Sequence, residues 1–507
     1  MTIEVISIGA SSARRVAGSW SKIDWDKAVR NVYRLQMRIA KARKLGKHGK
    51  VKSLQWLLTK SHHAKLLAVR RVTSSQGSKT AGIDGKIWTT AKDKYSAAVS
   101  LKRRGYRSQP LRRIYIPKRN GGMRPLSIPT IRDRAMQALH LMALEPIAEA
   151  AGDRNSYGFR RERSAQDAIQ QCYIVFARKG SAEWILEADI KSCFDNISHQ
   201  WLLDNIPMDR KILQSWLKAG HIYRQTLYME KAGTPQGGVI SPVLVNMVLD
   251  GLEATIKQAC PRNSKVNYIR YVDDFVVTAA TPELIQNRIK PVIEEYLQQR
   301  GLVLSETKTK ITHIEEGFNF LGFNIRKYKG KFLSKPSKES VKLFLKTIKV
   351  LVKRSYGWTA ARLVTLLNPK IRGWANYYKA ASSKATFGKI DDVLYHAVMN
   401  WVMRKHSNHA RRKAVARYFR CRGGFRRWIF SDHVKKKDGT KVLVCLMKMM
   451  DVMIQRHIKI RSEVNPFDIQ YREYLQKRRS WKIWVNKWQR RRDLRNYTLT
   501  GSRLPAK

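Results

Sequence analysis

Residues 271–277, YVDDFVV, place two acids side by side inside a strongly apolar run. The β-branched and aromatic residues on both sides of the pair are typical of β-strands. A buried run of this kind does not hold two carboxylates unless something compensates their charge. We therefore expect Asp273 and Asp274 at the tip of a tight hairpin, close to a positively charged partner.

A third acid follows a second buried-strand pattern. Residues 184–190, WILEADI, have a buried-strand pattern that leads to Asp189. Carboxylates that lie close together raise each other's pKa, and a divalent cation removes that repulsion. Hard oxygen ligands select Mg²⁺ or Mn²⁺, and two such ions about 3.5–4 Å apart can stabilise both oxygens of an in-line phosphoryl transfer. An Asp-Asp pair alone is most often a solvated turn, so this interpretation depends on the rest of the chain.

The net charge indicates a polyanionic partner. The 507 residues contain 100 Lys and Arg against 38 Asp and Glu, a formal charge of +62. RNA or DNA is the first candidate for offsetting such an excess, and an anionic membrane surface is the second. A hydrophobic content of 43% excludes a disordered chain.

Two classes of protein fit poorly. The five cysteines form no Cys-x-x-Cys pair, which argues against a zinc ribbon and suits reduced thiols. No stretch reaches the roughly 18 apolar residues of a membrane span, and the N-terminus lacks a signal-peptide core. We expect an intracellular protein, cytoplasmic in a bacterium and associated with the nucleoid or RNA, with an organelle as the alternative.

Local patterns predict the following elements. Residues 22–72 read as helices, residues 111–130 as two strands joined by an Asn-Gly-Gly turn, and residues 318–325 as a short strand with a turn. Ser198 and Ser241 are expected to cap helices. From about residue 335 strand signals fade and basic amphipathic segments dominate. Residues 401–507 carry 30 Lys and Arg against 7 Asp and Glu.

Together these motifs resemble the reverse transcriptases encoded by group II introns. The Tyr-x-Asp-Asp box at 271–274 and DIKSCFDNI at 189–197 resemble two of that family's acidic motifs. The same order of motifs continues with NSYGFRRERSAQDAI, TPQGGVISPVLVN, LSETKTKI and FNFLGF, and the segment PLRRIYIPKRNGGMRPLSIPTIRDRAMQ resembles the fingers. LLNPKIRGWANYY, at 366–378, resembles the maturase-specific region.

The resemblance implies roles for the acids. Asp189, Asp273 and Asp274 would be catalytic and would bind two Mg²⁺ ions, with Mn²⁺ as a substitute, and the backbone carbonyl of Ile190 would be a further ligand. Asp195 is expected to be structural.

The resemblance also implies contacts to the incoming dNTP. Phe194 would exclude a ribonucleotide 2′-hydroxyl, or else pack in the core. Lys118 and Arg124 would contact the triphosphate, or else only solvate a hairpin. Gln236 would support the nucleotide or template, and Lys308 would help to protonate the pyrophosphate.

Six further residues are expected to bind nucleic acid. Arg160 and Arg163 would touch template phosphate, or else pair with acids inside the domain. Two glycines of the Pro-Gln-Gly turn would let the backbone approach the template, and two residues of the maturase-like stretch complete the set: Gly237, Gly238, Arg372 and Trp374.

The expected fold is an α+β right-hand polymerase. Fingers and palm would be followed by a helical thumb and maturase domain and a basic C-terminal DNA-binding region. The expected limits are a basic helical extension at 1–85, fingers at 86–180, palm at 181–334, thumb and maturase-specific domain at 335–420, and the C-terminal region at 421–507.

The expected function is RNA-directed DNA synthesis together with maturase activity. The partners would be the parent intron RNA, an RNA template, a DNA primer or target and dNTPs, with no membrane. Without the Cys-x-x-Cys pairs of a His-Asn-His endonuclease, second-strand cleavage is not expected. Two alternatives stay open: an RNA-binding splicing cofactor with a decayed polymerase site, and a domesticated reverse transcriptase in defence.

Overall fold

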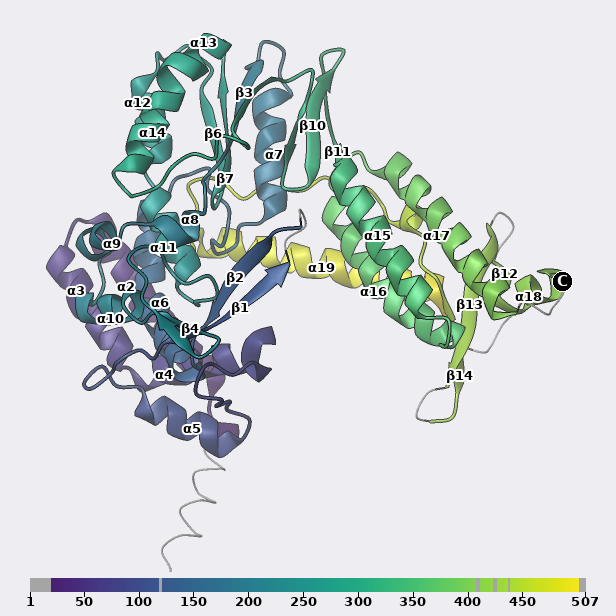
Figure 1. The fold of residues 1–507 in the computed structure, drawn as a ribbon, viewed down its shortest axis with the longest axis horizontal. Helices are drawn as coiled ribbons and strands as arrows, with labels where there is room; N and C mark the ends of the chain where they lie inside the picture. The colour runs from purple at the N-terminus through teal and green to yellow at the C-terminus, as the bar shows by residue number, and fades with distance from the viewer. Residues whose placement is uncertain (1–19, 118–120, 407–410, 423–425, 436–437, 501–507) are drawn as a thin grey trace, which may run out of the picture. The chain divides into compact units, whose positions relative to one another are not determined.

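The chain forms two compact units of mixed helix and sheet (Figure 1). The computed structural model describes residues 20–117, 121–406, 411–422, 426–435 and 438–500. Unit 1 contains the described residues of 1–164, 184–311 and 460–472. Unit 2 contains those of 165–183, 312–459 and 473–507. The predicted α+β class is confirmed, and the expected division into five consecutive segments stays a prediction.

The first helices of unit 1 pack around a buried central helix. They are α2 (Trp25–Lys44), α3 (His48–Lys60), α4 (His62–Thr73), η1 (Gln76–Lys79) and α5 (Ala91–Ser100), and α6 (Ile131–Ala151) contacts α2, α3 and α4. The helices predicted for residues 22–72 are confirmed. The side chain of Asp24 caps α2 by accepting from the Lys27 N–H at 2.8 Å. α6 is buried along nearly its whole length, so it forms the core of this part.

A sheet in the order β2-β1-β4-β5 lies beside these helices. It consists of β1 (Leu111–Pro117), β2 (Met123–Ile128), β4 (His221–Tyr223) and β5 (Thr226–Tyr228). The antiparallel pair β1 and β2 was predicted from the local sequence. The parallel pairing of β1 with β4 joins segments about 110 residues apart, which no local pattern indicates.

The second sheet of unit 1 contains the acidic hairpin. The strands are β3 (Trp184–Asp189), β6 (Asn267–Tyr271), β7 (Asp274–Ala279) and β8 (Lys310–His313), in the order β6-β7-β3-β8. The boundary between unit 1 and unit 2 falls within β8, after Ile311. The remaining helices of unit 1 are α8 (Cys193–Asn196), α9 (His199–Asn205), α10 (Arg210–Leu217), α11 (Ser241–Leu249), α12 (Leu252–Ala259), α13 (Pro282–Leu284), η2 (Ile285–Ile289) and α14 (Lys290–Gln298).

The two predicted serine caps had different outcomes. Ser198 caps α9, because its side chain accepts from the Trp201 N–H at 3.2 Å. The prediction that Ser241 caps a helix is wrong. The N-cap of α11 is Ile240, and the Ser241 hydroxyl instead donates to the Pro235 carbonyl at 2.9 Å. That bond ties the start of the helix to the preceding Pro-Gln-Gly turn.

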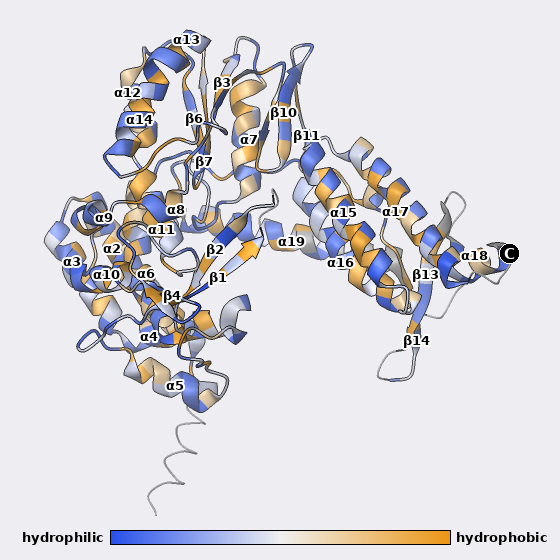
Figure 2. Cartoon of the chain, viewed as in Figure 1, coloured by the Kyte–Doolittle hydropathy of each residue, from blue (hydrophilic) through white to orange (hydrophobic). Residues whose placement is uncertain are grey.

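Unit 2 contains a small sheet and a helical bundle. Its elements begin with α7 (Ala165–Phe176), followed by β9 (Phe318–Phe320), β10 (Phe323–Tyr328) and β11 (Lys331–Pro336) in the order β11-β10-β9, then α15 (Lys338–Arg354), α16 (Ala360–Tyr378) and α17 (Lys384–Lys405). Orange and blue residues alternate along α16 and α17 in Figure 2, as expected for amphipathic helices.

The expectation that strands end near residue 335 is wrong. The later elements are α18 (Arg411–Tyr418), β12 (Phe419–Arg422), β13 (Arg426–Lys435), β14 (Lys441–Cys445), η3 (Met449–Asp451), η4 (Ile469–Tyr471), α19 (Arg472–Tyr497) and β15 (Thr498–Thr500), with a sheet in the order β12-β13-β14-β15. The prediction missed these strands because the surrounding sequence is rich in Lys and Arg. A local turn signal was present, since Asp438-Gly439 is a hairpin-turn dipeptide and Gly439 has a φ of 81°. None of the helices described is long and apolar enough to cross a membrane.

Candidate active site

The three predicted catalytic acids meet at one end of the sheet β6-β7-β3-β8. Asp189, the last residue of β3, lies directly opposite Asp274, the first residue of β7. Residues directly opposite in antiparallel strands share one face, with Cβ atoms about 4.5–5.5 Å apart. Asp273 precedes Asp274 in the turn between β6 and β7. The backbone register therefore sets Asp189 opposite Asp274 with Asp273 next in the turn, and the catalytic role of these acids stays a prediction.

The turn between the two strands is strained. Val272 has a φ of 64°, a left-handed conformation that a β-branched residue rarely adopts. Such a conformation costs about 1–3 kcal/mol and persists only where the surroundings impose it. Val272 is 3% exposed, and a Cβ on Gly158 would lie 2.4 Å from its Cγ2 atom and 2.8 Å from its backbone nitrogen. Only glycine at 158 leaves room for this turn.

A buried arginine anchors the hairpin from behind. Arg270 is fully buried in β6, and its guanidinium pairs with Asp250, donates to Asn246 Oδ1 at 3.2 Å and lies 3.8 Å from Asp153. Its backbone is also held, since Arg270 N donates to the Asn155 carbonyl at 3.0 Å. Sequence reasoning missed Arg270, although a charged residue inside so apolar a run was a visible signal.

The pKa values of Asp273 and Asp274 are both raised, so their ionised forms are disfavoured unless positive charge lies nearby. Burial, followed by the charges of Asp189 and Asp273, raises the pKa of Asp274 to about 7. The pKa of Asp273 is also raised, mainly by burial, while Lys308 and Arg124 act in the opposite direction. Both carboxyls are thus poised to take up a proton or to bind a cation.

Lys308 supplies part of that charge. Its Nζ atom lies 2.6 Å from Asp189 Oδ2, and Arg124 is exposed on β2 within electrostatic reach of Asp273. Lys118, which was predicted to act with Arg124, lies outside the described residues.

The donor set fits a hard divalent cation, because it consists of carboxylate oxygens, and burial together with the neighbouring acids raises the pKa of Asp273 and Asp274. Among the residues that the structure describes, no three His, Cys, Asp or Glu side chains are close enough together to hold a metal ion as they stand. Ile190 is buried and forms an antiparallel β-bridge with Leu304. The two hydrogen bonds of this bridge run from Lys191 N to Val303 O and from Ser305 N to Asp189 O, so neither of them uses the Ile190 carbonyl.

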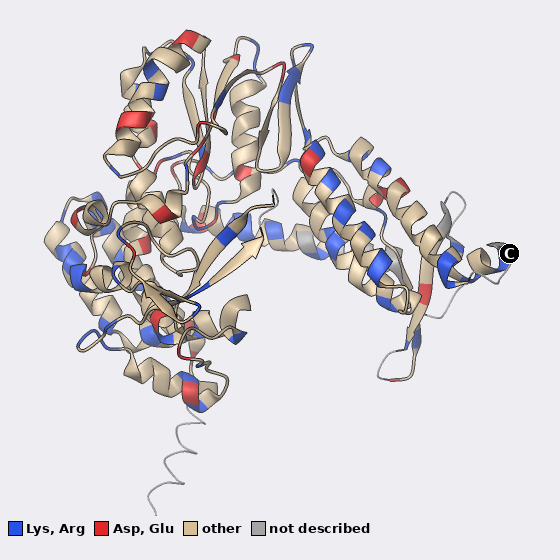
Figure 3. Ribbon diagram, viewed as in Figure 1, with Lys and Arg blue, Asp and Glu red and all other residues tan. Residues whose placement is uncertain are grey.

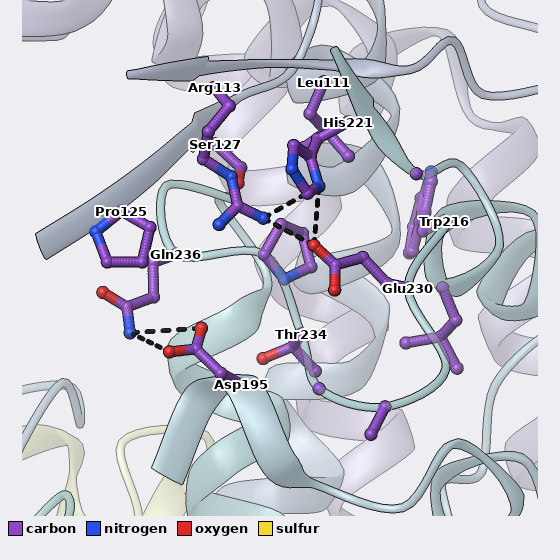
Figure 4. Close-up of a pocket in the computed structure, with 15 residues that line it drawn as sticks. Leu111, Arg113, Pro125, Ser127, Asp195, Trp216, His221, Glu230, Thr234 and Gln236 are labelled. Atoms are coloured by element: carbon purple, nitrogen blue, oxygen red, sulfur yellow. Dashed lines mark hydrogen bonds and ion pairs between the residues drawn. The ribbon is translucent and has the colours of Figure 1, made fainter. Parts of the chain in front are cut away.

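Gln236 is oriented by Asp195, as Figure 4 shows. Its Nε2 atom lies 3.3 and 3.4 Å from the two carboxylate oxygens of Asp195. An ionised carboxylate only accepts hydrogen bonds, so the amide nitrogen of Gln236 must face it and the amide oxygen faces away. Beside this pair lies a cavity of about 250 Å³, where Glu230 bonds to Arg113 at 2.5 Å and to His221 at 2.7 Å.

The two glycines after Gln236 pack against protein. A Cβ on Gly237, which has a φ of 122°, would lie 2.6 Å from the Ser127 carbonyl, and one on Gly238 would lie 2.5 Å from Ser241 Oγ. Phe194, in α8, is half-buried against the core of unit 1, so its predicted role as a steric gate stays a prediction.

The two arginines predicted to touch the template make contacts within unit 1. Arg160 has a side chain 5% exposed and pairs with Glu149 at 2.8 Å, so the structure shows the alternative role, pairing with an acid inside the domain. Arg163 donates to the carbonyls of Arg154 at 2.7 Å, Ser156 at 3.3 Å and Ser462 at 3.0 Å. The prediction overlooked these contacts because a motif does not reveal which way a side chain points.

The two predicted residues of unit 2 lie on α16. Trp374 packs against the rings of Phe344 and Tyr378, with centroid distances of 5.1 and 4.4 Å. Arg372 is partly exposed on the same helix. Lys and Arg recur along α15 and α16 in Figure 3.

Three family models match consecutive parts of the chain. They are the N-terminal domain of reverse transcriptase at residues 20–101, reverse transcriptase (RNA-dependent DNA polymerase) at 116–325, and the group II intron maturase-specific domain at 341–419. A reverse transcriptase domain implies a divalent-metal-dependent polymerase, and with the maturase domain it indicates RNA and other nucleic acid as partners.

Curated relatives agree with these matches. Protein YkfC of Escherichia coli (strain K12) is 34% identical over 310 residues, covering 52% of this chain and 81% of that protein. The group II intron-encoded protein LtrA of Lactococcus lactis subsp. cremoris is 27% identical over 437 residues, covering 67% and 72%. A telomerase from Candida albicans, solved with a fragment of telomeric RNA, is 13% identical with a TM-score of 0.35, covering 60% of this chain and 63% of that one. The chain belongs to the family of group II intron-encoded reverse transcriptases and maturases, and it is an RNA-directed DNA polymerase.

Proposed function

We propose that the protein copies its parent group II intron RNA into DNA during retrohoming and binds the same RNA to promote its splicing. The observation that carries this proposal is the register of β3 with β7, which sets Asp189 opposite Asp274 at the strained Val272-Asp273 turn. Because the charge of +62 needs a polyanion, a long structured RNA suits the whole chain as well as the site.

The carboxylates of Asp189, Asp273 and Asp274 would hold two Mg²⁺ ions, with Mn²⁺ as a substitute and the Ile190 carbonyl as a further ligand. When bound, such ions neutralise charge on the attacking and leaving oxygens of an in-line displacement. The raised pKa of Asp274 supports this assignment, since only a cation keeps both carboxyls of the pair ionised at neutral pH.

In the proposed reaction the 3′-hydroxyl oxygen of the primer attacks the α-phosphorus of a dNTP. The bond from that phosphorus to the β-phosphate oxygen breaks, the hydroxyl proton is lost and pyrophosphate leaves. Lys118 and Arg124 would bind the triphosphate, and Lys308 would release Asp189 and donate a proton to the pyrophosphate. Phe194 would exclude a 2′-hydroxyl, and Gln236 would present its amide oxygen to the nucleotide or template.

Maturase activity is assigned to unit 2. The basic faces of α15 and α16, with Arg372 beside the aromatic cluster of Trp374, would contact intron RNA. The basic segments after residue 421 would bind the DNA target. The presence of all three acids argues against a splicing cofactor with a decayed polymerase site, and the maturase-specific match argues against a defence enzyme.

The test is primer extension on an RNA template with dNTPs, with and without Mg²⁺. Extension should require Mg²⁺ and should be abolished by Asp273→Ala combined with Asp274→Ala. The same variant should bind intron RNA and support splicing as well as the wild type, because unit 2 is unchanged. Asp204→Ala, an acid with 46% of its side chain exposed, is the control and should extend normally. Wild-type protein that binds RNA but extends no primer would refute the polymerase assignment.

A further inference from the structure

A C-terminal segment folds back into the polymerase unit. Residues 460–472 belong to unit 1, although the chain both before and after them belongs to unit 2. The last family match ends at residue 419, so these residues lie beyond all three matched models. We call residues 460–472 the strap.

The strap has three buried apolar side chains and contacts Tyr33 of α2. Ile460, Val464 and Phe467 are each no more than 1% exposed. Tyr33, on α2, donates its hydroxyl to the Pro466 carbonyl at 2.9 Å, and its ring centroid lies 6.3 Å from that of Phe467. A buried phenylalanine contributes about 3–5 kcal/mol, so this docking is stronger than a surface contact.

The strap also holds the loop that follows α6. One terminal guanidinium nitrogen of Arg163 donates to the Ser462 carbonyl at 3.0 Å. The other terminal nitrogen donates to the Arg154 and Ser156 carbonyls. The Arg161 guanidinium lies 5.2 Å from the ring centroid of Phe467. Residues 154–163 are thus fixed to the strap at two points.

The same loop supports the catalytic hairpin. Tyr157 N donates to the Arg270 carbonyl at 2.9 Å, which with the bond from Arg270 N to Asn155 O forms a bridge beside β6. The next residue, Gly158, fills the space behind Val272. The strap therefore meets the 154–163 loop at two pairs, Phe467 with Arg161 and Ser462 with Arg163. The same loop reaches the turn that carries Asp273 through Gly158.

We infer that the strap is a positioning element of the polymerase site, which keeps the 154–163 loop pressed against the left-handed turn at Val272. The inference rests on the proposed function, because it concerns the same carboxylates. A strained turn relaxes when its surroundings loosen, and a displacement of about 1 Å at reacting groups can cost roughly 100-fold in rate.

The experiment uses the full-length chain with Phe467→Ala. We expect kcat for single-dNTP addition to fall about tenfold or more, while the KM for dNTP and the affinity for primer–template stay within about twofold, since only the geometry of the carboxylates changes. Phe467→Leu, which keeps most of the apolar volume, should recover most of the rate. Ile458→Ala is the control, because Ile458 lies just before the strap and is 56% exposed.

Hydrogen exchange provides a readout that does not depend on activity. Backbone amides of residues 267–279 should exchange faster in Phe467→Ala and normally in Ile458→Ala. Release of the strap with unchanged exchange in the hairpin and unchanged kcat would overturn the inference. A wild type that extends no primer would instead refute the proposed function and leave the exchange result to decide the role of the strap.

If Phe467→Ala does not fold, Tyr33→Phe replaces it. That variant keeps the ring and removes only the hydrogen bond to Pro466. We expect kcat to fall about two- to fivefold with faster exchange in the hairpin, and wild-type values of both would overturn the inference.

Discussion

The raised pKa of Asp274 predicts that removing its charge stabilises the protein while it destroys activity. The folded-state pKa is about 7, against 3.8 for the unfolded chain. The native state therefore binds this proton more tightly, so the contribution to stability is fully present below pH 3.8 and is lost as the pH rises through 7. A difference of about three pKa units corresponds to about 4 kcal/mol, which the partial exposure of the site reduces to roughly 2–4 kcal/mol.

Asp274→Asn should thus be more stable than the wild type at pH 8 in EDTA. For a unit of roughly 300 residues, the gain corresponds to a rise in melting temperature of about 3–6 °C. At pH 5 more than half of the difference should vanish, because the wild-type carboxyl is then protonated in the native state. Added Mg²⁺ should narrow the gap at pH 8, since it binds the wild-type site better.

The assay is thermal unfolding of the full-length protein at both pH values, with EDTA or Mg²⁺. Asp392→Asn, an acid with 71% of its side chain exposed, is the control and should change the melting temperature little. An Asp274→Asn variant that melts at or below the wild-type temperature at pH 8 in EDTA would refute the electrostatic reasoning. Loss of primer extension in the same variant is expected in either case.

Three further changes test the geometry of the site. Gly158→Ala would place a Cβ 2.4 Å from Val272 Cγ2, so kcat for single-nucleotide addition should fall at least about tenfold with unchanged RNA affinity; a wild-type rate would contradict the packing argument. Lys308→Gln removes the ammonium group that lies 2.6 Å from Asp189 and competes with a bound cation. In a titration at pH 8.5 the Mg²⁺ concentration that gives half-maximal activity should therefore fall. The value of kcat should fall about tenfold, because the proton donor to pyrophosphate is lost. An unchanged Mg²⁺ requirement would show that Lys308 does not compete with the ion. Phe194→Ala should raise ribonucleotide incorporation in a dNTP and rNTP competition assay, and an unchanged ratio would remove the steric-gate assignment.

The acidic hairpin was predictable because its signals are local. Apolar, β-branched and aromatic residues on both sides of Asp273-Asp274 indicate the strands, and the two acids between them mark the turn. The same holds for the hairpin at 111–128 and for Ser198 at the start of α9. The hairpin of β13 and β14 carried a comparable Asp-Gly signal, which the surrounding lysines obscured.

The sequence could not decide between the alternative roles of several arginines, because these roles depend on what packs around each side chain. Arg160 and Arg163 belong to one short basic motif, yet the first is buried against Glu149 and the second binds backbone carbonyls of the loop and strap. Arg270 is fully buried beside Asp250. A charged residue has the same sequence signature on a surface and in a buried ion pair, and only neighbours distant in the chain distinguish the two.

By itself the sequence determined the chemistry of this protein: three acids on strand ends, a cationic chain and the order of motifs that identifies a polymerase. The tertiary structure alone decided what holds those acids in place, namely the Gly158 backbone behind Val272, the buried Arg270 and a strap from residues nearly 200 positions beyond the hairpin. The physical reason is that strand and turn formation depends on neighbouring residues, whereas burial, ion pairing and backbone strain depend on contacts between distant segments.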